Sequence, residues 1–252
     1  MNIKKHIPNL FTLGNLLCGI IATVYAVVGR FEYVAIFVLI GIILDFFDGF
    51  LARILKVSGE LGKQLDSLAD MVTSGVVPGI VMFTILNNNN FVIESLFSDI
   101  VTTTFIETKD NHYLSFLGFL LTISACYRLA KFNIDTRQSD SFIGLPTPAM
   151  SLFVVSLPLI SMTTNMVFVK AILENQYYLI GVTLVLSYLM NSEIRLLSLK
   201  FKNFGVAENK MKYLLMISSI ILLITLQYLA VPIIILLYVV LSIIENTLPK
   251  KA

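Results

Sequence analysis

Residues 45–70 read DFFDGFLARILKVSGELGKQLDSLAD, and the rest of the chain is best interpreted outward from this stretch. It contains four carboxylates: Asp45, Asp48, Asp66 and Asp70. Long apolar runs at 33–55 and 66–86 surround them, and the segment between these runs has glycine, serine and charged residues that are typical of a turn. The pattern predicts a helical hairpin with acids inside apolar helices.

The spacing of the acids predicts that the two pairs meet. Asp45 and Asp48 are three residues apart, and Asp66 and Asp70 are four apart, so each pair shares one face of its helix. Counted from a turn near Ser58, both pairs lie roughly 12 to 20 Å along helices that rise about 1.5 Å per residue. Four carboxylates at that depth repel one another and lose solvation, so a compensating cation is expected.

The ligand chemistry indicates a hard cation. Carboxylate ligands without histidine or cysteine suit Mg²⁺ or Mn²⁺, with Ca²⁺ as a further option, and not zinc or copper. Four aspartates favour two ions, an arrangement that commonly serves phosphoryl chemistry. Gly49 and Gly62 leave room for a bulky ligand or a neighbouring helix. Ala52 is small for the same reason, and Arg53 offers a planar fork for phosphate.

Aspartates within a membrane can also serve without a resident metal. They can form ion pairs with Arg53 or Lys63, or they can face a watery vestibule in a cation transporter. Four acids at helical spacing beside glycine and arginine favour the metal site over both.

The same residues resemble a known family. DxxDGxxAR, eight residues and then GxxxDxxxD is the signature of the CDP-alcohol phosphotransferases, and this chain matches each of its specified positions: Asp45, Asp48, Gly49, Ala52, Arg53, Gly62, Asp66 and Asp70. The resemblance implies an all-α membrane bundle with a six-helix core.

The composition agrees with a polytopic membrane protein. The chain has 252 residues, of which 57% are hydrophobic and 13% charged, and its mean hydropathy is +0.86. About eight spans are expected: 9–28, 33–55, 66–86, 113–134, 147–169, 176–192, 211–229 and 231–246. Cys18 and Cys126 are predicted to be packing residues. A net charge of +2 gives no argument for a nucleic-acid partner.

The basic residues predict the orientation. With a cytoplasmic N-terminus, only Arg30, Lys109 and Lys170 of the 18 lysines and arginines lie on the far side, which leaves fifteen on the cytoplasmic side. The chain is therefore expected in the cell membrane, the inner one where there are two, with its site open to the cytoplasm. The first span is expected to be a retained helix. We divide the chain into a core at 1–192 and a cytoplasmic connector with a C-terminal hairpin at 193–252.

The first span carries a polar stripe. Asn9, Thr12 and Asn15 recur every third residue on an otherwise apolar helix. Asn9 can cap the helix while the other two form hydrogen bonds between helices, or the stripe can face a nucleotide. The family resemblance, which includes a comparable PNxxT segment, favours nucleotide contacts by Asn9 and Thr12.

A second basic segment lies at 126–149 and carries Arg128, Lys131 and Arg137; its RLAKFN and GLPTPA resemble segments of bacterial and archaeal phosphatidylserine synthases. As ordinary topology anchors, Arg128 and Lys131 need no ligand; alternatively they form an anion-binding wall near the acids. Lys131 stands where that group commonly has arginine, and it keeps the charge but not the bidentate fork.

The narrower resemblance implies transfer of a phosphatidyl group from CDP-diacylglycerol to the hydroxyl of L-serine, with release of CMP. By analogy with the family, Asp70 is the base, and Arg53 with Gly49, Ala52 and Gly62 surrounds the nucleotide. Arg128 and Lys131 are the expected contacts of the serine carboxylate. The resemblance also implies a homodimer among membrane lipids. A sister transferase that uses glycerol 3-phosphate or an inositol phosphate stays open, as does the transporter.

Overall fold

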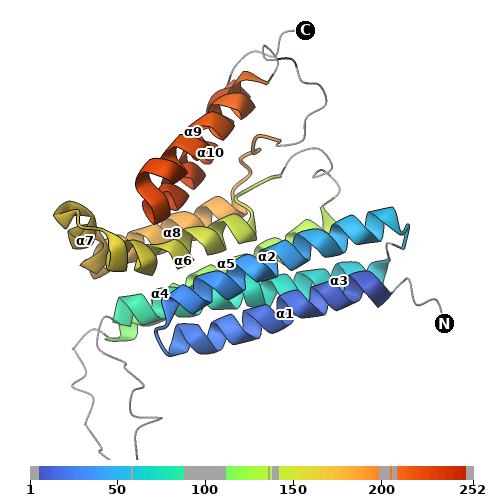
Figure 1. The fold of residues 1–252 in the computed structure, drawn as a ribbon, viewed down its shortest axis with the longest axis horizontal. Coiled ribbons are helices and arrows are strands. Elements are labelled where there is room, and N and C mark those ends of the chain that lie inside the picture. Colours follow the sequence, from blue (N-terminus) through green and yellow to red (C-terminus); the bar gives the residue numbers. More distant parts are fainter. Residues whose placement is uncertain are drawn as a thin grey trace, which may run out of the picture.

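The computed structural model describes residues 6–57, 59–87, 112–135, 137, 142–198, 205 and 209–247. Within these residues the chain is helical, and the one β-bridge joins Ile143 to Arg195 in antiparallel pairing. Figure 1 shows the helices of the first half lying side by side as an elongated bundle, with the C-terminal pair inclined to it. The predicted all-α membrane bundle is confirmed.

The first half of the bundle is built from two consecutive turns. Helix α1 (His6–Val27) meets α2 (Phe31–Ile54) through Gly29, whose φ is +74°. Helix α2 is followed by α3 (Glu60–Asp70), which continues as a π-helix, η2 (Met71–Val76), and then as α4 (Val77–Asn87). The predicted hairpin is therefore present. Its second arm was expected to begin at residue 66 but begins at Glu60, because polar residues can form the first turns where a helix leaves the membrane.

The second half begins with a short 3-10 segment, η3 (His112–Phe119), which leads into α5 (Leu120–Ile134). Next come α6 (Thr147–Thr163), α7 (Val167–Glu174) and α8 (Gln176–Asn191). The prediction of one span over 147–169 was wrong at its end. Thr164 adopts extended backbone and its hydroxyl accepts a hydrogen bond from the Met166 N–H, so a separate helix starts beyond it.

The chain ends in a helical hairpin. Helix α9 (Lys210–Leu226) is followed by a single 3-10 turn, η4 (Gln227–Leu229), and by α10 (Ala230–Thr247). Gln227 has a φ of +49°, which breaks the helical path, and the two helices pack against each other. The expected pair of C-terminal helices is present, with the break a few residues before Pro232.

Five helical runs in the described residues are long and apolar enough to cross a membrane: 6–27, 31–54, 60–87, 113–134 and 210–247, the last being the two-helix hairpin. Helix α6 is apolar but shorter. Apolar side chains on the outer face of α1, such as Leu10, Leu17 and Val24, are exposed, whereas Thr12 and Asn15 are buried. This inside-out pattern is that of a multi-pass membrane protein.

Residues 88–111 and most of 199–208 lie outside the described residues. The two cysteines differ in their exposure. Cys18 is buried as expected, but Cys126 is exposed on α5, so the prediction that it is a packing residue was wrong. Hydropathy alone does not say which face of an apolar helix points outward.

Candidate metal and phosphoryl-transfer site

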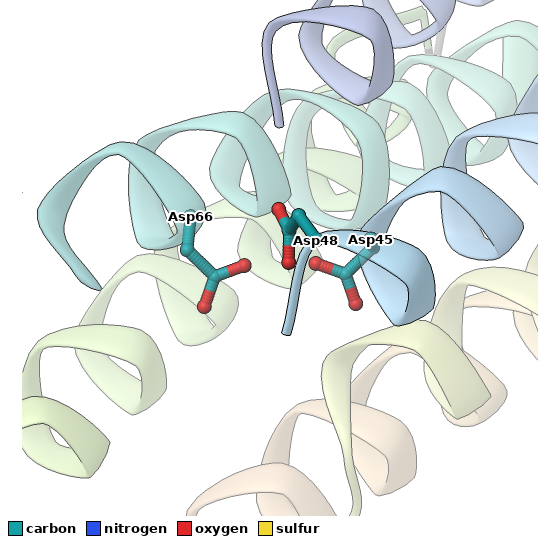
Figure 2. Close-up of side chains that lie close together, drawn as sticks. All are labelled: Asp45, Asp48 and Asp66. Carbon is teal, nitrogen blue, oxygen red and sulfur yellow. The ribbon is translucent and has the colours of Figure 1, made fainter. Parts of the chain in front are cut away.

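The acids of the hairpin converge as their spacing predicts. One carboxylate oxygen from each of Asp45, Asp48 and Asp66 lies within 4.8 Å of the others. Figure 2 shows these three side chains directed toward one space between α2 and α3. Asp48 is buried, and the other two are half-buried.

Asp70 lies beside this group. It is half-buried on the last turn of α3, within electrostatic range of Asp66 and Asp48, and its Oδ1 accepts a hydrogen bond from Asn15 Nδ2 at 3.2 Å. The structure thus gathers three acids at ligand distance of one another and places the fourth next to them.

Within the described residues, the ion pairs formed by Lys131 and Arg137 are with Asp135 and Glu193 and not with the four acids. The Arg53 Nε donates to the Gly49 carbonyl at 2.9 Å, one turn back on its own helix. Lys63 Nζ donates to the Asn133 carbonyl at 2.5 Å. Ion pairing with Arg53 or Lys63 is therefore not what the structure contains, and the donor set fits a hard divalent cation.

Helix α1 supplies hydrogen-bond donors to two of the acids. The Thr12 hydroxyl donates to Asp48 Oδ2 at 2.5 Å, and Asn15 reaches Asp70. Both side chains are buried. The predicted hydrogen bonding between helices is confirmed at these two positions of the stripe. Asn15 was visible as part of that stripe, but its contact with Asp70 was not predicted.

Small residues allow α1 to approach this closely. A Cβ at Gly19 would overlap Thr73, and a Cβ at Gly41 would lie 2.8 Å from Asn15 Oδ1. By contrast, a Cβ at Gly62 would lie 3.6 Å from Asn9 Oδ1, and at Gly49 the nearest atom is Arg53 Nη2 at 4.0 Å. No neighbouring helix crowds Gly49 or Gly62, so the space at these two glycines stays open, as their predicted role toward a ligand requires. Ala52 is half-buried beside them.

The π-helix follows directly after Asp70. Its wider turn leaves carbonyl groups that accept hydrogen bonds from other helices. Thr122 Oγ1 on α5 donates to the Gly75 carbonyl at 2.9 Å, and Ser151 Oγ on α6 donates to the Thr73 carbonyl at 3.4 Å. Thr73 Oγ1 in turn donates to the Asn15 carbonyl at 3.1 Å. Three helices therefore hold the segment that carries Asp70.

Arg128 of α5 is a buried cation that interacts electrostatically with Asp70. It is 7% exposed, its Nε has no hydrogen-bond partner, and it is within electrostatic range of Asp70. It also lines a small pocket, with Lys131, Ile143, Met190, Asn191 and Ser192. A buried guanidinium with an unpaired donor is typical of a group that receives an anion.

Lys131 is placed differently from Arg128. It lines the same pocket, but its Nζ forms an ion pair with Glu193 Oε1 at 2.6 Å. This hydrogen bond and the charges of Lys131 and Arg137 hold the pKa of Glu193 below its usual range. Arg137 is also near Glu193, at 3.4 Å. Sequence reasoning missed three residues here, which lie at and just after the end of the apolar helix α8 and match no motif: Asn191, Ser192 and Glu193.

Comparison with known proteins adds independent findings. A family model described as CDP-alcohol phosphatidyltransferase matches residues 5–189. The CDP-diacylglycerol–serine O-phosphatidyltransferase of Bacillus subtilis is 33% identical over 195 residues, which cover 76% of this chain and 89% of that protein. The protein of the same name from Helicobacter pylori is 30% identical over 75% of this chain and 70% of its own length. The archaetidylserine synthase of Methanothermobacter thermautotrophicus is 26% identical over 62% of this chain and 61% of its own.

Proposed function

The chain belongs to the CDP-alcohol phosphatidyltransferase family, and we propose that it is a phosphatidylserine synthase of that family. It transfers the phosphatidyl group of CDP-diacylglycerol to the hydroxyl of L-serine and releases CMP. The observation that carries this proposal is a cluster of acids without a basic partner, next to a buried arginine that lines a pocket.

In this reaction the serine oxygen bonds to the phosphorus atom that carries diacylglycerol. The bond from that phosphorus to the bridging oxygen of the diphosphate breaks, and the electron pair leaves with CMP. The hydroxyl proton goes to a base, for which we propose Asp70. Asn15 holds one oxygen of Asp70, so the other oxygen is free of that hydrogen bond and can take the proton.

Four acids are proposed as metal ligands: Asp45, Asp48, Asp66 and Asp70. When bound, Mg²⁺ or Mn²⁺, and in the two-ion arrangement a pair of them, neutralises the diphosphate and stabilises negative charge on the departing oxygen. The hydrogen bond from Thr12 orients Asp48 toward its neighbours. The clustering of three of these acids supports the assignment.

The open surface beside the acids suits the nucleotide and phosphates of the donor. We propose that Gly49, Ala52 and Gly62 make room for it and that Arg53 contacts it, with Asn9 and Thr12 at the end of α1. Arg53 is exposed, and its Nε bonds to a carbonyl of its own helix, so it can turn toward a phosphate at small cost.

We propose that Arg128, which borders a small pocket, contacts the carboxylate of the acceptor. A serine carboxylate at Arg128 satisfies the unpaired Nε and brings the hydroxyl to the side on which Asp70 lies. Lys131 contributes positive charge at the rim, where Glu193 already holds it. An acceptor with a phosphate group needs more positive charge than this pocket offers, which favours serine over glycerol 3-phosphate.

We further propose that the site opens to the cytoplasm across the cell membrane and that the protein forms a homodimer. The asymmetry of lysines and arginines supports the orientation, and the family resemblance suggests the dimer. The division into a core at 1–192 and a C-terminal part at 193–252 is likewise proposed.

The test is CMP release from CDP-diacylglycerol by the purified protein, with serine, glycerol 3-phosphate and inositol phosphate supplied in parallel. We expect release with serine, dependent on Mg²⁺ or Mn²⁺ and abolished by a chelator; Ca²⁺ is run as a third cation. Release with another acceptor alone contradicts the assignment to serine but retains the phosphotransferase site. No release with any acceptor contradicts the proposed enzymatic activity and favours a cation transporter.

A further inference from the structure

The C-terminal hairpin contacts the chain just after the region that matches the family model. That model ends at residue 189, and the segment at 191–197, here called the closing strip, follows. The closing strip contributes Asn191 and Ser192 to the pocket beside Arg128. The strip therefore forms part of the wall of this pocket.

Helix α10 holds the closing strip through three side chains. Ser242 Oγ accepts the Leu197 N–H at 2.9 Å, and the Tyr238 hydroxyl donates to the Leu197 carbonyl at 3.0 Å. Asn246 Nδ2 donates to the Arg195 carbonyl at 2.7 Å. Three polar side chains of an otherwise apolar helix thus form hydrogen bonds with the backbone of one short segment.

The closing strip also joins two hydrophobic clusters. The Leu197 side chain is buried with Leu215 of α9 and Leu241 of α10, whereas Leu196 belongs to the main core. Because neighbouring residues of an extended segment point to opposite sides, each anchors the strip to a different part of the molecule. The strip is therefore packed between the hairpin and the main core, to which Ile235 and Val239 of α10 also belong.

The other edge of the strip is bound to the segment before α6. Leu196 N donates to the Phe142 carbonyl at 2.8 Å, and Gly144 N donates to the Ile194 carbonyl at 2.9 Å. Gly144 has a φ of +73°, and a Cβ there would overlap the Met190 carbonyl. Glu193 adds the ion pair with Lys131 of α5. The strip is held on both edges, from the bundle and from the hairpin.

We propose that α10 is a support for the acceptor pocket, with Ser242 and Tyr238 as positioning residues that hold the closing strip beside Arg128. This inference rests on the proposed function, because it treats that pocket as the serine site. It gives a role to two helices that lie outside the match to the family model. Neither residue contacts the four acids, so their effect is expected on the acceptor and not on the donor.

The experiment measures CMP release while serine and CDP-diacylglycerol are varied separately, for Ser242→Ala, Tyr238→Phe and the double variant. Loss of one such hydrogen bond is expected to raise the KM for serine about three- to tenfold, and the double variant to raise it further. The kcat and the KM for CDP-diacylglycerol are expected to stay within about twofold of wild type. Ser218→Ala is the matched control, because the Ser218 hydroxyl bonds only carbonyls of its own helix, α9.

The outcomes separate the two proposals. If the wild type releases no CMP with serine, the proposed function fails and this inference fails with it. If the wild type uses serine but the double variant keeps the wild-type KM for serine, only the positioning role fails. An equal rise in the KM for serine and the KM for CDP-diacylglycerol indicates general damage to the protein and also contradicts the positioning role. Tyr238→Phe removes one oxygen without opening a cavity, so it tests the proposal even if Ser242→Ala does not fold.

Discussion

The α2–α3 hairpin has one apolar and one polar arm, whereas both helices of the α9–α10 hairpin are apolar, and the two hairpins use their polar residues differently. In the first, carboxylates from both arms face a common space, and Thr12 and Asn15 of a third helix bond to them. In the second, the polar side chains of α10 bond to the backbone of one extended strip.

This difference shows which polar residues of a membrane protein indicate a functional site from the sequence alone. A carboxylate in a membrane needs compensation by a cation or a donor, so its position constrains several helices. A serine hydroxyl can be satisfied by a carbonyl of its own helix, as Ser242 is by Tyr238, and so it does not by itself indicate a partner elsewhere. The acids of the first hairpin therefore indicate a function from the sequence alone, whereas the role of the second hairpin follows only from its contacts.

The largest effect expected is in the first hairpin. Asp70→Asn removes the proposed base and a charge without changing size, and turnover should fall about 10²- to 10⁴-fold. CMP release from purified, folded protein measures it. Glu32→Gln is the control, because it removes an exposed acid at the opposite end of α2. Near-wild-type turnover in Asp70→Asn would contradict the assignment of the base.

The next effect tests whether α1 serves the acids. Thr12→Val removes the hydroxyl that donates to Asp48, and the Mg²⁺ concentration for half-maximal activity should rise about 10- to 100-fold. Thr23→Val is its match on the same helix, since the Thr23 hydroxyl bonds only the Gly19 carbonyl. If both variants need the same Mg²⁺ concentration for half-maximal activity, the Thr12 hydroxyl has no specific role at the acids.

A third variant tests the close approach of α1 in terms of stability. Gly19→Ala places a Cβ against the backbone of Thr73, and overpacking of this kind costs about 1 to 3 kcal/mol of unfolding free energy. The measurement is the thermal unfolding midpoint in detergent. In Gly181→Ala the new Cβ meets nothing within 4 Å, so this control should keep or raise the midpoint. Equal midpoints for the two variants would contradict tight packing at Gly19.

The smallest effect is expected at the exposed ion pair of the closing strip. The pKa of Glu193 is lowered in the folded state. The ion pair therefore stabilises the fold above the usual carboxyl range, and this stabilisation is lost as pH falls through the lowered pKa. Glu193→Gln removes this ion pair at every pH, and the KM for serine should change by no more than about twofold. Assays between about pH 6 and 8 should show no step from this group. A larger change would mean that Glu193 takes part in serine binding.

The sequence was sufficient to predict the α2–α3 hairpin and the meeting of its acids, because helical spacing converts directly into a shared face. It also identified Arg128 and the stripe on α1. It could not distinguish Arg128 from Lys131, since Lys131 pairs with Glu193, which lies 62 residues away, and the burial of Arg128 follows from how the helices pack. It placed Arg53 near a phosphate, whereas its observed contact is with the Gly49 carbonyl, and the predicted phosphate contact stays a prediction.

The closing strip and the π-helix were not predictable for a different reason. Both are defined by backbone hydrogen bonds, and MVTSGV at 71–76 has no composition that separates a π-helix from an α-helix. Gly19 and Gly41 cannot be told from other glycines of membrane helices by sequence, because their role depends on the close approach of Thr73.

The π-helix after Asp70 makes the third helical run two pieces with different phase. A residue accommodated in a wider turn shifts every later side chain by about 100° around the axis relative to a continuous α-helix. The piece before the shift presents Asp66 and Asp70 toward α2, and the piece after it presents Val77, Val81 and Met82 to the core. If all six residues of 71–76 adopted a regular α-helix, one piece would rotate against the other, whereas deleting one of them would give a continuous α-helix that keeps both faces in phase. The register of the acids and the register of the core are thus set separately within one membrane span.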